Sequence, residues 1–160
     1  MKFFGDPSPN KKAIFDTKID FNSITILEKA YAFLELKGLS KSSLFYKFPI
    51  ETCFVSSWFL ASYFTSIKYE ALQWIFGNSE KYGGHVWLES KDYTIDFTYS
   101  QFEPISTKFL FYKNTSAKPY FHDHFTIVDK GYFGDSFEKN KKHPLILQMV
   151  DEFQKTLSTK

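Results

Sequence analysis

Residues 83–102 read GGHVWLESKDYTIDFTYSQF, and this stretch has the pattern of a β-hairpin. Two runs rich in aromatic and β-branched residues flank a polar centre at Lys91 and Asp92. If these two residues form the turn, Glu89 pairs with Thr94, and every second residue along each strand shares a face. One face then carries only apolar side chains, which are Val86, Leu88, Ile95 and Phe97. This alternation favours a hairpin with an even register.

The other face of the same hairpin carries a histidine and an aspartate. In the even register Trp87 pairs with Asp96 and His85 with Thr98, so His85 and Asp96 are diagonal neighbours. A four-residue loop preserves this arrangement, whereas a three-residue loop moves Asp96 to the opposite face. Neither Asn-Gly nor Asp-Gly occurs at the turn, so the turn residues leave the loop length open.

The only cysteine, Cys53, stands at the predicted start of a helix. Thr52 before it can act as the N-cap, and the segment 53–64 is apolar on nearly all sides, which predicts a buried central helix. A thiol in the first turn faces the positive end of the helix dipole, which favours the thiolate. A cysteine nucleophile, a histidine base and an aspartate that orients the histidine together form the general arrangement of acyl-transfer triads.

The order of these motifs resembles the transglutaminase-like branch of the papain-like cysteine enzyme superfamily. The motifs are a cysteine at a helix start, H-x-W-x-E at His85–Glu89 and I-D-x-T-x-x-Q-F at Ile95–Phe102. The resemblance implies a papain-like core in which the cysteine helix packs on a small antiparallel sheet. It also implies Cys53 as the nucleophile, His85 as the general base and Asp96 as the orienting acid. The implied activity is acyl transfer or amide hydrolysis on a peptide or protein amide, as in a peptidase, deamidase or transglutaminase, without a cofactor.

The chain departs from the pattern of papain-like peptidases in two respects, and one is its short length, which offers only a minimal substrate cleft. Those enzymes often carry a glutamine shortly before the cysteine that helps to form the oxyanion hole, and here no glutamine precedes Gln73. Other candidate donors to the oxyanion hole are the backbone N–H of Cys53 and the hydroxyl of Tyr46. The missing glutamine and the small size motivate a second hypothesis, in which the chain is a catalytically silent member of this fold and acts as a binding or regulatory module.

The remaining pattern predicts an α+β fold in a single domain, residues 1–160, with residues 1–20 as an N-terminal arm. Asn22 or Ser23 can cap the first helix, and Gly38 ends it. The predicted helices and strands follow in chain order: a helix over 23–37, the cysteine helix over 53–64, strands over 69–76, 84–89, 93–99, 108–112 and 124–128, and a closing amphipathic helix over 144–157.

A second histidine cluster lies late in the chain. His122 and His124 would share one face of a strand, which could begin a metal site, with Asp123, Asp129 or His143 as a third ligand. None of these third ligands stands at an established spacing. The cluster is therefore interpreted as exposed loop or edge-strand histidines, and no metal is predicted.

Composition narrows the possible partners. All 20 basic residues are lysines, the formal net charge is +2, and the one dense cluster, at 139–143, is typical of a solvated turn, so no nucleic-acid partner is expected. The longest apolar stretch is too short to cross a bilayer, and the opening residues do not form a signal peptide, so no membrane partner is expected. A single cysteine rules out an internal disulfide framework. A cytoplasmic protein is the resulting expectation.

Overall fold

The computed structural model describes residues 21–69, 71–103, 107–114 and 120–159. The predicted arm, residues 1–20, and the side chains of the two proposed cap residues, Asn22 and Ser23, lie outside this description. Two α-helices come first, the strands follow, and two α-helices come after them, and this segregation confirms the predicted α+β class. In chain order they are α1 (Phe21–Lys37), α2 (Cys53–Ser66), β1 (Gln73–Ser79), β2 (Gly83–Glu89), β3 (Tyr93–Asp96), η1 (Tyr99–Gln101), β4 (Leu110–Lys113), η2 (Tyr120–His124), β5 (Thr126–Tyr132), α3 (Asp135–Glu138) and α4 (His143–Ser158).

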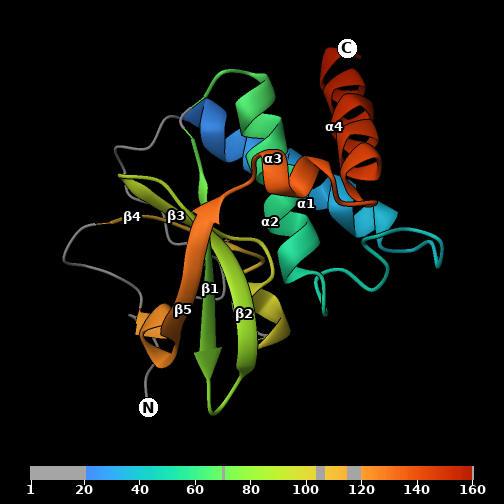
Figure 1. The fold of residues 1–160 in the computed structure, drawn as a ribbon. Helices are drawn as coiled ribbons and strands as arrows, with labels where there is room; N and C mark the ends of the chain where they lie inside the picture. Colours follow the sequence, from blue (N-terminus) through green and yellow to red (C-terminus); the bar gives the residue numbers. More distant parts are fainter. Residues whose placement is uncertain (1–20, 70, 104–106, 115–119, 160) are drawn as a thin grey trace.

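The strands form one antiparallel sheet in the order β4-β3-β2-β1-β5. The helices lie together on one side of this sheet, and α2 is placed between the sheet and α4 (Figure 1). Helix α2 is buried along nearly its whole length, as its apolar sequence predicts, and Trp58 and Phe59 are among its fully enclosed side chains. The cysteine helix therefore packs on the antiparallel sheet.

The two faces of the sheet pack into different hydrophobic clusters. Leu88 and Ile95 face the helices and belong to the main core, together with side chains of α1, α2 and α4. Trp87 and Tyr112 belong to a second cluster, which is closed by Phe121 and other aromatic residues near η2. Because neighbouring residues of a strand point to opposite faces, the apolar alternation of the hairpin supplies both clusters.

The hairpin has the predicted even register. Leu88 pairs with Ile95 and Glu89 with Thr94, and the backbone N–H of Ser90 donates to the carbonyl of Tyr93 at 2.8 Å across the turn. The ladder then stops, and β3 ends at Asp96, although the strand was predicted to continue to residue 99. The physical reason is the Asp96 carboxylate, which accepts the backbone N–H of Thr98 at 3.0 Å and so turns the chain out of the sheet.

The first strand begins later than predicted, at Gln73 rather than at Tyr69. Helix α2 ends in a Schellman motif, with Lys68 in the left-handed region at φ 56°. The N–H of Tyr69 donates to the carbonyl of Phe64 at 2.9 Å, so Tyr69 belongs to the end of the helix rather than to a strand. Within the described ranges, no helix combines the length and apolar character needed to cross a membrane.

Candidate active site

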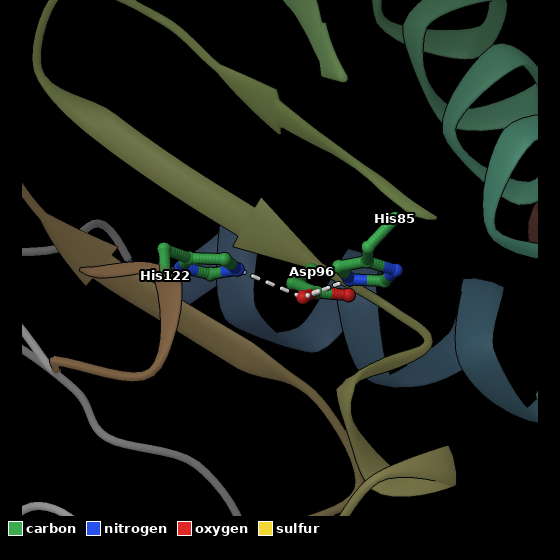
Figure 2. A group of neighbouring side chains, drawn as sticks. All are labelled: His85, Asp96 and His122. Atoms are coloured by element: carbon green, nitrogen blue, oxygen red, sulfur yellow. Dashed lines mark hydrogen bonds and ion pairs between the residues drawn. The ribbon is translucent and has the colours of Figure 1, made fainter. Parts of the chain in front are cut away.

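His85 and Asp96 meet on the face of the sheet that packs toward η2. The Nε2 atom of His85 lies 2.7 Å from Oδ2 of Asp96, and the two residues are 0% and 1% exposed (Figure 2). His85 is opposite Gly77 of β1, and a Cβ at Gly77 would come within 2.8 Å of the Trp87 ring. Glycine at position 77 therefore leaves space for the Trp87 ring beside His85. The predicted juxtaposition of His85 and Asp96 is present.

The buried carboxylate of Asp96 is hydrogen-bonded at both oxygens. Oδ1 accepts from the backbone N–H of Thr98, and Oδ2 accepts from both His85 and His122, the latter at 2.9 Å. A buried charge is costly unless such donors replace its hydration. Together with the hydroxyl of Thr98, which donates to Oδ1 at 3.4 Å, these donors account for how an ionised aspartate is held in a segment that is otherwise aromatic.

The charges of His85 and Asp96 stabilise each other. Burial lowers the pKa of His85, but the negative charge and hydrogen bond of Asp96 outweigh it and raise the pKa to about 9. Burial raises the pKa of Asp96, but the charge of His85 and the hydrogen bonds from His122 and His85 outweigh it and hold that pKa well below its usual range. At neutral pH the pair is therefore an imidazolium and a carboxylate.

Cys53 is the first residue of α2 and is partly exposed, unlike the other two predicted site residues. After the larger effects of burial and of Asp96, the Cys53 thiol also raises the pKa of His85. Thr52 occupies the N-cap position as predicted but makes no capping hydrogen bond; its hydroxyl accepts instead from Ser56. Cys53 thus stands at the head of the helix that packs on β2, the strand that carries His85.

The second ring nitrogen of His85 differs from the first in its surroundings. Nε2 is bonded to Asp96, and within the described part of the chain the buried Nδ1 has no hydrogen-bond partner of normal geometry. A buried imidazolium N–H without an acceptor costs on the order of 1–3 kcal/mol. The neighbouring group whose charge acts on this ring, besides Asp96, is the thiol of Cys53.

His122 completes the buried cluster, and the sequence did not predict its role. It was expected to share a strand face with His124, but both residues lie in the short 3-10 helix η2, so that prediction is wrong. His122 instead points to Asp96 (Figure 2), and its ring packs on Trp87 at a centroid distance of 4.5 Å. No spacing in the sequence indicates this contact, since 26 residues separate His122 from Asp96.

Two histidines and a carboxylate are also a set of metal ligands. One ligand atom from each of His85, Asp96 and His122 lies within 4.8 Å of the other two. Ligand atoms about 2.1 Å from a tetrahedral zinc stand roughly 3.4 Å apart. The observed separations of 2.7 and 2.9 Å from Oδ2 are hydrogen-bond lengths, so a metal would have to displace both protons and spread the ligands.

Other residues of the resembling motifs surround this site. The indole N–H of Trp87 donates to Glu89 at 3.0 Å and so holds the Glu89 carboxylate next to the hairpin. The Oε1 atom of Gln101 accepts the backbone N–H of Glu51, which stands two residues before Cys53, at 3.2 Å. Gln101 therefore links the end of the hairpin to the loop that leads into the cysteine helix.

Comparisons with known proteins were made at the level of family models, curated sequences and solved structures. No family model matches the chain, no curated protein matches it, and no solved structure matches it.

Proposed function

We propose that the protein is a cysteine-dependent acyl-transfer or amide-hydrolysing enzyme with a transglutaminase-like, papain-like core. In this proposal Cys53 is the nucleophile, His85 the acid and base, and Asp96 the residue that orients His85. The observation that carries the proposal is the orientation of His85. Its Nε2 is fixed by a buried carboxylate, which leaves Nδ1 for the thiol at the head of α2.

The first half of the reaction forms an acyl-enzyme. The thiolate of Cys53 attacks the carbonyl carbon of an amide, the new C–S bond forms, and the π electrons move to the oxygen. The imidazolium of His85 gives its Nδ1 proton to the departing amine as the C–N bond breaks. The pKa of about 9 keeps that proton on His85 until the leaving group needs it.

The second half of the reaction releases the acyl group. Neutral His85 takes a proton from water or from an amine, which attacks the thioester carbon. The C–S bond then breaks, and the electron pair returns to the sulfur of Cys53. Water as the acceptor gives hydrolysis, and an amine gives transfer. A peptide or protein amide is the proposed substrate class, and the chemistry needs no cofactor.

The test uses the fact that the chain contains one cysteine, so every alkylation event reports on Cys53. The rate of alkylation by iodoacetamide is measured at about pH 6 on the folded protein and on the same protein in denaturant. A thiol that is only partly buried reacts more slowly when folded, whereas a thiolate held beside an imidazolium reacts faster. Incubation with 4-nitrophenyl acetate should add one acetyl group to Cys53, detected by mass spectrometry.

The matched control for this test is His85→Gln, which keeps a polar side chain but cannot carry the imidazolium charge. We expect it to remove the difference between folded and unfolded alkylation rates and to prevent acetylation. If wild-type protein is alkylated no faster when folded than when unfolded, the activated nucleophile is ruled out. That result would favour the second hypothesis, a silent member of the fold that acts as a binding or regulatory module.

A further inference from the structure

Asp96 has a second support that comes from outside the hairpin. His122 in η2 donates from Nε2 to the same carboxylate oxygen that His85 uses (Figure 2), and Nδ1, on the other side of its ring, lies 3.0 Å from the hydroxyl of Tyr112. His122 and Tyr112 are both buried. Both nitrogens of this imidazole are thus engaged, in contrast to those of His85.

The hydrogen bonds define where the protons of this chain lie. An ionised carboxylate only accepts, so Nε2 of His122 is the donor to Asp96. With the proton on Nε2, Nδ1 accepts from the hydroxyl of Tyr112. Burial raises the pKa of Tyr112, so its phenol remains protonated and able to donate. Tyr112 therefore selects the one His122 tautomer that can bind Asp96.

The ring of His122 is also held in place by packing. It stacks on Trp87 with an interplanar angle of 27°, and it lies nearly parallel to the ring of His85, at 4°. The carboxylate of Asp96 is thus fixed between two parallel imidazoles, while its other oxygen is tied to the N–H of Thr98. Rotation of the carboxylate away from His85 would break all of these bonds together.

We propose that His122, with its tautomer set by Tyr112, is a positioning residue that fixes the Asp96 carboxylate and its hydrogen bond to His85. The inference rests on the proposed function of Cys53, His85 and Asp96. It adds a second histidine and a tyrosine to that site, so that a chain of hydrogen bonds runs from Tyr112 through His122 and Asp96 to the imidazole beside the thiol.

The test compares three substitutions with a matched control. His122→Phe keeps a ring against Trp87 but removes the donor to Asp96. His122→Gln places an amide N–H near the position of Nε2, and Tyr112→Phe removes only the hydroxyl. The control, His124→Phe, makes the same change two positions later in η2, outside the group formed by His85, Asp96 and His122.

The first readout is the rate of Cys53 alkylation as a function of pH. Losing one hydrogen bond to a charged group should slow alkylation at neutral pH by about tenfold or more in His122→Phe. The acid limb of the profile should also move to higher pH, because the hydrogen bond of His122 helps to lower the pKa of Asp96. His122→Gln should recover most of the rate, and His124→Phe should match the wild type.

The second readout is the titration of the His85 ring by nitrogen-edited NMR, which does not depend on the thiol. If wild-type Cys53 is not activated, the proposed function fails. The positioning role is still tested in that case, because a change of the His85 titration in His122→Phe would show that His122 positions Asp96. If wild-type Cys53 is activated but neither the acid limb nor the His85 titration changes, the positioning role is overturned.

Two further outcomes also decide the question. If His122→Phe does not fold, Tyr112→Phe decides alone, and an unchanged pH profile and His85 titration in that variant overturn the proposal. If the protein purified without a tag contains stoichiometric zinc that His122→Phe loses, the three residues form a metal site, and the positioning role is overturned as well.

Discussion

The substitution Asp96→Asn removes one charge from the centre of the site with little change in side-chain volume. The asparagine amide has one acceptor, so it cannot accept from both histidines at one end and from the N–H of Thr98 at the other. We expect the variant to be less stable than the wild type at every pH, and we expect the loss to depend strongly on pH.

The magnitude of that pH dependence follows from His85. Its pKa is about 9 in the folded protein, against 6.5 for an unperturbed histidine. Because the folded pKa is the higher one, the pair stabilises the fold fully below about pH 6.5 and progressively less as the pH rises through about 9. Each unit of pKa corresponds to about 1.4 kcal/mol, so the difference between the folded and the unperturbed pKa of His85 contributes roughly 3 kcal/mol to the free energy of unfolding. The pKa of Asp96 is lowered, so the carboxylate is ionised throughout this range.

The assay is urea unfolding followed by tryptophan fluorescence at about pH 6 and about pH 10, for wild type, Asp96→Asn and a control variant, Asp92→Asn. Asp92 lies in the exposed turn of the same hairpin. The loss in the free energy of unfolding caused by Asp96→Asn should be about 3 kcal/mol larger at about pH 6 than at about pH 10. The loss caused by Asp92→Asn should not differ between the two pH values. Other groups titrate equally in all three proteins. Parallel pH dependences for wild type and Asp96→Asn would refute the coupling between His85 and Asp96.

Three further predictions concern the surroundings of the site. Gly77→Ala should cost about 1–3 kcal/mol in urea unfolding, because the new Cβ would lie 2.8 Å from the Trp87 ring, and an unchanged unfolding midpoint would contradict this contact. Gln101→Ala should slow alkylation of Cys53 without a comparable loss of stability, because it releases the N–H of Glu51 in the loop before the helix; an unchanged rate would show that this tie does not position the thiol. Metal analysis of protein purified without a tag should find no stoichiometric zinc, and one zinc per chain would instead assign the cluster in Figure 2 to a metal.

The sequence predicted the hairpin and its register because these depend on local alternation. An odd register would have placed Asp96 among the apolar side chains that face the helices, at a high cost in free energy. The same residue also explains where the prediction was wrong. A propensity pattern treats Asp96 as one position of a longer strand, whereas its carboxylate accepts the N–H of Thr98 and ends the strand.

The role of His122 was not predictable from the same kind of pattern. Periodicity assigns residues to faces of an element, and here it assigned His122 to a strand that is a 3-10 helix in the structure. The contact with Asp96 depends on the path of the chain between β4 and β5. One signal was present in the hairpin itself, since a buried carboxylate needs more donors than His85 and a backbone N–H can supply. A search for a further donor would have had only three other histidines to consider.

Stability alone does not account for the arrangement around His85. Buried ion pairs can often be replaced by apolar residues of similar volume without loss of stability, so a fold selected only for stability has no need of this one. A fold selected only for stability would also gain by giving every buried polar atom a hydrogen-bond partner. In this protein the side-chain atoms of Asp96 and His122 have such partners. Nδ1 of His85 is the exception among the atoms of this cluster, and it belongs to the ring whose pKa the Cys53 thiol raises. In the proposed function, the proton on this nitrogen is the one that moves between His85 and the substrate.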